Sequence, residues 1–194
     1  VYDLIVSEDP DTKSGIVQTK WVDIIGANVN LAGAELDLIA MDHREARLKL
    51  VLDKVKDEYD YVFIDCPPSL GLLTLNCLCA ADSFLVPLQC EYYALEGLSQ
   101  LMTTVRMVKK NMNPKLSLEG VLLTMFDGRT NLSIQVVEEV KKHFPGEVFS
   151  SVVPRNVRLS EAPSHGLPIF AYDRFSRGAA AYDALVQEIL TKGA

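Results

Sequence analysis

The chain has 194 residues, 48% of them hydrophobic, and a net charge of −7 with acidic and basic residues interspersed. This size and composition are sufficient for a substantial core. The charge excludes a protein that coats nucleic acid through its overall charge, but it is compatible with a local basic patch. The four cysteines lack a disulfide-like spacing, and no apolar run reaches the length of a membrane span. We therefore expect reduced cysteines and a cytoplasmic protein.

The first part of the chain contains a polar arm followed by amphipathic segments. Residues 1–20 are polar and turn-rich, and we expect them to form a connecting arm. A short strand is predicted over 21–25, and apolar residues recur at helical spacing over 31–40 and 44–56. Because the first residue is Val, we expect the chain either to begin inside a longer product or to have been processed.

Residues 59–71 combine an apolar strand with a proline-rich turn. Four aromatic and aliphatic residues precede Asp65, and a turn that no helix accommodates follows it. The turn contains Pro67, Pro68 and Gly71. The pattern predicts a buried strand with a carboxylate at its tip, where open α/β sheets bind ligands. Such an acid suits a metal or its water shell, and on these residues alone a helix cap is an equally good interpretation.

The remainder of the chain alternates predicted helices and strands. We expect helices over 72–80, 95–111, 132–144 and 178–190, and strands over 83–88, 118–125, 148–153 and, for a short one, 169–171. Apolar strands separated by helices indicate an α/β fold with a mostly parallel sheet covered by helices on both faces. We expect a single α/β domain over residues 1–194. The polar segment 154–168 is predicted to be a long loop, and such loops are often functional.

The residue types argue against zinc binding and nucleophilic hydrolysis. Cys77 and Cys79 are two positions apart and face different sides of a predicted helix, and the three histidines are far apart. No Gly-x-Ser-x-Gly motif occurs. Nucleotide binding remains, because Asp65 suits the second acid of a P-loop NTPase, which holds the Mg²⁺ shell. The phosphate-binding pattern Gly-x-x-x-x-Gly-Lys-Ser/Thr does not occur in these residues.

Several blocks of this sequence resemble the ParA/Soj family of chromosome- and plasmid-partition ATPases, a deviant-Walker class of P-loop NTPases. The blocks lie at 30–35, 59–76, 89–97, 152–166 and 176–179. The resemblance implies an ATPase that dimerises around two ATP–Mg²⁺ molecules and binds DNA non-specifically as that dimer. A ParB-type partner then stimulates hydrolysis, and the protein is associated with the nucleoid, with no membrane as partner. In the family pattern, the P-loop and the switch I Asp lie upstream of the segment that matches Val1.

The same resemblance assigns roles to individual residues. Asp65 corresponds to the Walker B acid that holds a water of the Mg²⁺ shell, and Pro67, Pro68 and Gly71 correspond to switch II. The residues matching the adenine pocket are Thr124, Met125, Pro154, Arg155 and Asn156. We expect DNA contacts from Arg155, Arg158 and Arg177, since phosphate contacts need basic side chains on a face free of acids. For Met125 a core position, and for the arginines a solvated surface, are equally good interpretations.

Other functions remain open alongside the partition ATPase. A catalytically silent fragment or paralogue without a P-loop would act as a binding module, and its sheet would keep an unpaired edge that favours association. A division-site regulator resembling MinD would need a terminal amphipathic helix, which residues 191–194 do not provide. Iron–sulfur carriers of the same superfamily need paired cysteines that the Cys-x-Cys spacing does not match.

Overall fold

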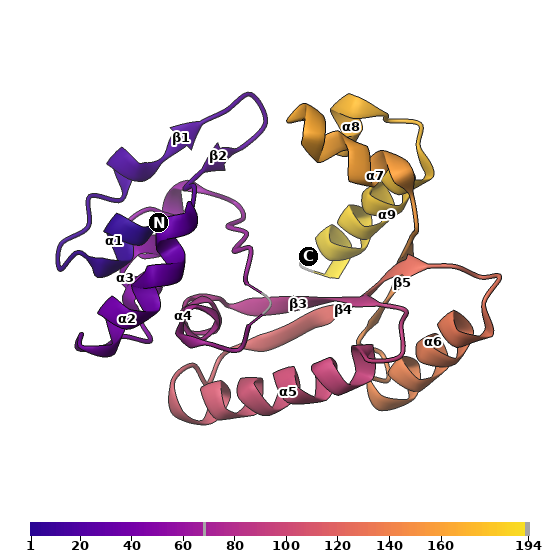
Figure 1. Cartoon of the computed structure of the whole chain (residues 1–194), viewed down its shortest axis with the longest axis horizontal. Helices are drawn as coiled ribbons and strands as arrows, with labels where there is room; N and C mark the ends of the chain where they lie inside the picture. Colours follow the sequence, from indigo (N-terminus) through magenta and orange to yellow (C-terminus); the bar gives the residue numbers. More distant parts are fainter. Residues whose placement is uncertain (68, 193–194) are drawn as a thin grey trace. The chain divides into compact units, whose positions relative to one another are not determined.

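The computed structural model describes residues 1–67 and 69–192 (Figure 1). The chain divides into two compact units, each described here by itself. The first unit contains Val1–Asp82 and Leu101–Ser117, and the second contains Ser83–Gln100 and the chain from Leu118 onward. Whether the units act as the expected single domain stays a prediction.

The first unit is built from short helices around a small apolar core. Its elements are α1 (Tyr2–Val6), a 3₁₀ turn (Lys13–Gly15), the strands β1 (Val17–Gln18) and β2 (Asp23–Ile24), a 3₁₀ turn (Val29–Gly33), α2 (Ala34–Ile39), α3 (Arg47–Leu52), a 3₁₀ turn (Lys56–Glu58) and α4 (Leu72–Ala80). The core combines Leu4 and Ile5 with Ala34, Leu38 and Val51. Our expectation of a connecting arm over 1–20 is therefore wrong, because adjacent apolar residues of α1 are buried and the arm continues into an antiparallel hairpin.

The apolar segment 61–64 is not a strand, which corrects the prediction of a buried strand before Asp65. Tyr61, Val62 and Phe63 are 55%, 45% and 83% exposed. A strand requires a neighbour that satisfies its backbone N–H and C=O groups. Within the described residues no backbone segment pairs with these positions. The β-forming side chains of the segment are therefore not sufficient to make it a strand.

The second unit contains a three-stranded parallel sheet in the order β3-β4-β5. Its elements are β3 (Ser83–Gln89), β4 (Ser117–Phe126), α6 (Asn131–His143), β5 (Val148–Pro154), α7 (Val157–Glu161), a 3₁₀ turn (Ala162–His165), α8 (Ile169–Tyr172) and α9 (Arg177–Lys192). Helix α5 (Ala94–Asn111) begins in this unit and ends in the first. Helices α6 and α9 lie on opposite faces of the sheet (Figure 1), which confirms the α/β fold with a mostly parallel sheet.

The core between the sheet and α9 consists of Leu122, Phe149, Val153 and Leu185. These residues come from β4, β5 and α9, at positions that the strand and helix periods place on facing surfaces. None of the helices in the described part of the chain is long and apolar enough to cross a membrane.

Two predictions about the segment after β5 are wrong. The expected loop at 154–168 contains α7, whose N-terminus is capped by the side chain of Asn156, and a 3₁₀ turn that ends at Gly166 with φ +62°. The expected short strand at 169–171 is helix α8, which follows Pro168. Asn156 caps α7, and the carbonyl of Pro168 accepts the N–H groups of Ala171 and Tyr172, so helical turns form where apolar character alone indicated a strand.

Candidate functional site

Asp65 lies in the first unit, at the exposed end of the unpaired segment. Together with Pro67 it lines a cavity of about 660 Å³, whose other walls are largely apolar. The structure thus places the predicted metal acid beside the first proline of the predicted switch. Pro68 lies outside the described residues.

The turn ends at Gly71, which directly precedes α4. The Glu35 carboxylate on α2 accepts a hydrogen bond from the backbone N–H of Leu73 at 3.2 Å. A Cβ atom on Gly71 would overlap Glu35 Oε1, so a larger residue there would displace this carboxylate from its contact with Leu73. The hydroxyl of Thr74 also donates a hydrogen bond to the carbonyl of Ser69. Glu35, to which the sequence analysis assigned no individual role, therefore caps the helix that follows the turn.

Two cysteine side chains interact beside Asp65. A hydrogen bond with Cys77 lowers the pKa of the Cys66 thiol, and the same bond, together with burial, raises the pKa of Cys77. Cys66 is exposed, whereas Cys77 is buried in α4. This contact joins the residue after Asp65 to the helix behind the turn.

The residues predicted for the adenine pocket lie together in the second unit, at the carboxyl ends of β4 and β5. Pro154 is opposite Phe126 in the parallel ladder, and the N–H of Arg155 donates to the carbonyl of Phe126 at 3.3 Å. The carbonyl of Thr124 accepts a hydrogen bond from the N–H of Cys90 at 3.1 Å. Ligands of parallel sheets bind at this end of the strands.

Met125 has an unusual backbone conformation in this cluster. Its φ of +53° lies in the left-handed region, which residues other than glycine rarely adopt. Backbone strain of this kind concentrates at ligand sites. His43 has the same φ value, so the ligand-site role of Met125 stays a prediction.

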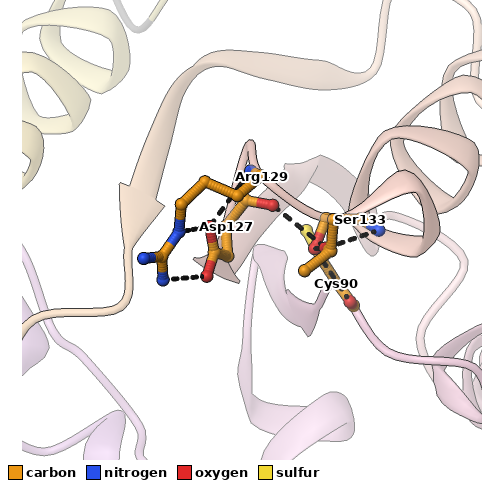
Figure 2. Close-up of polar contacts among 5 residues, drawn as sticks. Cys90, Asp127, Arg129 and Ser133 are labelled. Atoms are coloured by element: carbon orange, nitrogen blue, oxygen red, sulfur yellow. Dashed lines mark hydrogen bonds and ion pairs between the residues drawn. The ribbon is translucent and has the colours of Figure 1, made fainter.

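Asp127 and Arg129 form a bidentate ion pair in the loop after β4 (Figure 2). Arg129 Nε lies 2.9 Å from Asp127 Oδ1, and Nη2 lies 2.6 Å from Oδ2. The guanidinium holds the pKa of the Asp127 carboxyl well below its usual range, because its hydrogen bonds favour the ionised form. The sequence analysis missed this pair, although the spacing Asp-Gly-Arg after an apolar strand is a turn signal.

A chain of hydrogen bonds continues from this loop to the end of β3. The Thr130 hydroxyl donates either to the Asp127 carbonyl at 3.0 Å or to the Ser133 hydroxyl at 2.9 Å. The Ser133 hydroxyl is 3.5 Å from the carbonyl of Cys90 (Figure 2). Thr130 is also the N-cap of α6, since its side chain accepts the N–H of Ser133. The loop after β4 is thereby attached to the residue that follows β3.

The arginines predicted to contact DNA differ in their surroundings. Arg155 is 3.6 Å from Glu91. Arg158 forms ion pairs with Glu161 at 2.9 Å and with Asp173 at 3.4 Å. Arg177 begins α9 and has no ion pair with the residues that the structure describes. The face around Arg158 is therefore not free of acids, contrary to the condition assumed from the sequence.

The described residues do not include three or more His, Cys, Asp or Glu side chains gathered to hold a metal directly. Asp65 fits a different type of metal contact. Its exposed carboxylate forms no ion pair within residues 1–67 and 69–192, so it is free to accept hydrogen bonds from a water of a hydrated Mg²⁺.

The chain is similar to known proteins over its whole length. A protein-family model described as "AAA domain" matches residues 1–118. The chain is 58% identical over 195 residues to the sporulation initiation inhibitor protein Soj of Bacillus subtilis (strain 168), covering 100% of this chain and 77% of that protein. It is 55% identical over 175 residues to the chromosome partitioning protein ParA of Myxococcus xanthus, covering 90% of this chain and 62% of that protein.

A solved structure has a similar fold. The cobyrinic acid a,c-diamide synthase of Mycobacterium smegmatis, solved with ADP and magnesium, has a TM-score of 0.80 and 36% identity. The match covers 100% of this chain and 73% of that one.

Proposed function

Because the chain belongs to the Soj/ParA family of chromosome-partitioning ATPases, we propose that it provides the metal-acid, base-binding and DNA-binding parts of an ATP-dependent DNA-partitioning switch. The 58% identity with Soj over the whole chain is the observation that carries the proposal. In this proposal, an ATP-bound dimer binds DNA without sequence preference in the cytoplasm, on the nucleoid. A ParB-type partner ends the bound state by stimulating hydrolysis.

In the metal part of the proposal, Asp65 holds a water of the Mg²⁺ shell. Magnesium, when bound, supplies positive charge that stabilises the phosphates during transfer. The exposed Asp65 carboxylate and its place beside Pro67 support this role. In this arrangement the proline-rich turn can change conformation when the Mg²⁺-bound water at Asp65 is gained or lost. Glu35 and Gly71 position the turn at its other end.

In the nucleotide part, the base contacts Thr124, Met125 and the segment 154–156. These residues share the carboxyl end of the parallel sheet, and the thioether of the half-buried Met125 suits contact with a flat apolar ring. Asn156 orients the segment, because its side chain accepts the N–H of Arg158 at 2.8 Å.

In the DNA part, Arg177 contributes more than Arg155 or Arg158. A phosphate must compete with Glu91 for Arg155, and with Glu161 and Asp173 for Arg158. Arg177 has no such competitor among the described residues. Its contact with phosphate therefore costs no existing ion pair.

A chimera tests this proposal. The P-loop segment of the Bacillus subtilis relative is placed ahead of Val1, and binding to non-specific DNA is measured across salt concentrations with and without ATP and Mg²⁺. We expect ATP-dependent binding that Asp65→Asn abolishes. Arg177→Ala should weaken binding to all sequences and reduce the salt slope by about 1, whereas Lys141→Ala at the end of α6 serves as a charge-matched control. Binding that is absent or independent of ATP contradicts the proposal.

A further inference from the structure

Phe175 is an aromatic residue in the turn between α8 and α9, and it is 89% exposed. Ser176 is the N-cap of α9, since its hydroxyl accepts the N–H of Ala179 at 3.1 Å. An apolar residue directly before an N-cap often packs against the fourth residue of the helix, which here is Ala180. The exposure of Phe175, and of Ala180 itself, shows that this packing does not occur. Local helix packing therefore does not account for an aromatic ring at this position.

The backbone that carries this ring is held on both sides. The N–H of Phe175 donates to Asp173 Oδ1 at 3.2 Å, and the hydroxyl of Ser176 donates to the carbonyl of Asp173 at 2.8 Å. The ring thus projects from an ordered turn, and a contact that it makes with another molecule does not need to order the backbone. A protruding side chain on a fixed backbone is suited to insertion into a partner.

Three arginine side chains surround the turn of Phe175. The Arg174 guanidinium lies over the ring, 5.2 Å from its centroid. Arg177 follows two positions later and forms no ion pair within residues 1–67 and 69–192. Arg158 Nε is 3.4 Å from Asp173, whose other carboxylate oxygen accepts the N–H of Phe175. An apolar ring therefore lies among cations that attract phosphate.

Proteins that bind nucleic acids without sequence preference combine these two features. Basic side chains bind the phosphates, and aromatic or other apolar side chains insert between base steps or stack on bases. Stacking tolerates any sequence because every base has a π face. A ring that stays in water beside phosphate-bound arginines keeps its apolar surface exposed, whereas insertion between bases buries that surface.

We propose that Phe175 is a wedge whose ring inserts at a base step of duplex DNA while the arginines around it bind the phosphates. The inference rests on the proposed DNA-partitioning function and adds a base contact to the phosphate contacts of that site. Insertion partly unstacks a base step, and pyrimidine–purine steps unstack most easily. The wedge therefore gives the protein a preference for deformable DNA, such as duplexes rich in TA steps, without reading any base edge.

Salt-dependent DNA binding separates the wedge from the phosphate contacts. In the chimera with the Bacillus subtilis P-loop segment, with ATP and Mg²⁺, Phe175→Ser should weaken binding about five-fold or more at every salt concentration. Its salt slope should equal that of the unchanged chimera, because stacking releases no counterions, whereas Arg177→Ala reduces the slope. Phe175→Tyr keeps an aromatic ring and should bind as the unchanged chimera does.

Trp21→Ser is the matched control. Trp21 is a 51% exposed aromatic residue in the other unit, and Lys20 Nζ lies over its ring at 4.5 Å from the centroid. The control thus removes an exposed ring that has a cation over it, as Phe175 has, and it should leave the DNA affinity unchanged. Thermal unfolding should show the same Tm for Phe175→Ser as for the unchanged protein, since the ring is exposed.

The fluorescent base 2-aminopurine tests insertion directly, because its fluorescence increases when it unstacks. It replaces the adenine of the TA steps in a short duplex, and fluorescence is measured with the DNA saturated by protein. The unchanged chimera should increase the fluorescence, and Phe175→Ser should not. An unchanged affinity of Phe175→Ser, an affinity loss with a shallower salt slope, or an equal fluorescence increase would overturn the wedge and leave the proposed function standing. Absence of ATP-dependent binding by the unchanged chimera would instead overturn the proposed function, and the wedge with it.

Discussion

The carboxylate of Glu35 accepts the backbone N–H of Leu73 at 3.2 Å, so a residue of α2 caps the first turn of α4. A negative charge at a helix N-terminus also interacts favourably with the helix dipole. The turn that follows Asp65 is thus held by a side chain about 30 positions away from it in the sequence.

Replacing Glu35 tests this cap. We expect Glu35→Ala to lower the free energy of unfolding by about 0.5–2 kcal/mol, as for the loss of other N-terminal caps. Glu35→Gln keeps an acceptor oxygen without the charge, and its loss should be smaller. Urea unfolding of the variants provides the measurement, and equal losses for the two variants would show that the hydrogen bond is not the stabilising contact.

Replacing Gly120 by alanine should lower the stability of the protein, whereas replacing Gly97 by alanine should not. In β4, a Cβ on Gly120 would overlap the ring of the buried Phe149, and overpacking of this kind costs about 1–3 kcal/mol. In the exposed part of α5, Gly97 has no atom near its Cβ position, and alanine there should stabilise the helix by up to about 1 kcal/mol. Thermal unfolding should show a lower Tm for Gly120→Ala and an unchanged or higher Tm for Gly97→Ala.

Asn76 connects α4 with the start of α3 and is 1% exposed. Its Oδ1 accepts the N–H of Leu48 at 3.0 Å, and its Nδ2 donates to the carbonyl of Arg44 at 2.8 Å. Asn76→Ala leaves these buried groups unpaired, with an expected cost of roughly 2–3 kcal/mol. The control is Asn111→Ala at the exposed end of α5, for which denaturant unfolding should show a change within about 0.5 kcal/mol.

The ion pair of Asp127 with Arg129 predicts a pH dependence. The folded-state pKa of Asp127 is lower than its unfolded value, so its contribution to stability is fully present above the ordinary Asp pKa. The contribution is lost as the pH falls from there through the depressed pKa. An NMR titration of the Asp127 carboxyl carbon should show the pKa rising toward its ordinary value in Arg129→Gln. Arg174→Gln, whose guanidinium lies over Phe175, should leave it unchanged.

Helices and paired strands with a strong local pattern were predictable. The expected helix at 72–80 matches α4, and the strands expected at 118–125 and 148–153 match β4 and β5 within two residues. Periodicity and terminal residues determine such elements, because each one meets its hydrogen-bonding partners within the described chain. The family blocks likewise identify the Soj/ParA family from the sequence alone.

The predictions that were wrong concern positions whose structure depends on the surrounding residues. The pattern at 61–64 has the composition of a strand, but a strand is a paired structure, and the described residues provide no partner for it. The roles of Glu35 and the environment of Arg158 were also inaccessible, because contacts between distant residues are not encoded in local spacing.

The sequence by itself determined the α/β class, the family and the approximate extents of β4 and β5, since these follow from side-chain type and order. Only the tertiary structure showed that the segment before Asp65 is exposed and pairs with no strand among the described residues, and that Glu35 caps the helix after the turn. The physical reason is that hydrogen-bond satisfaction and burial depend on what surrounds a residue, whereas propensity depends on the residue and its near neighbours.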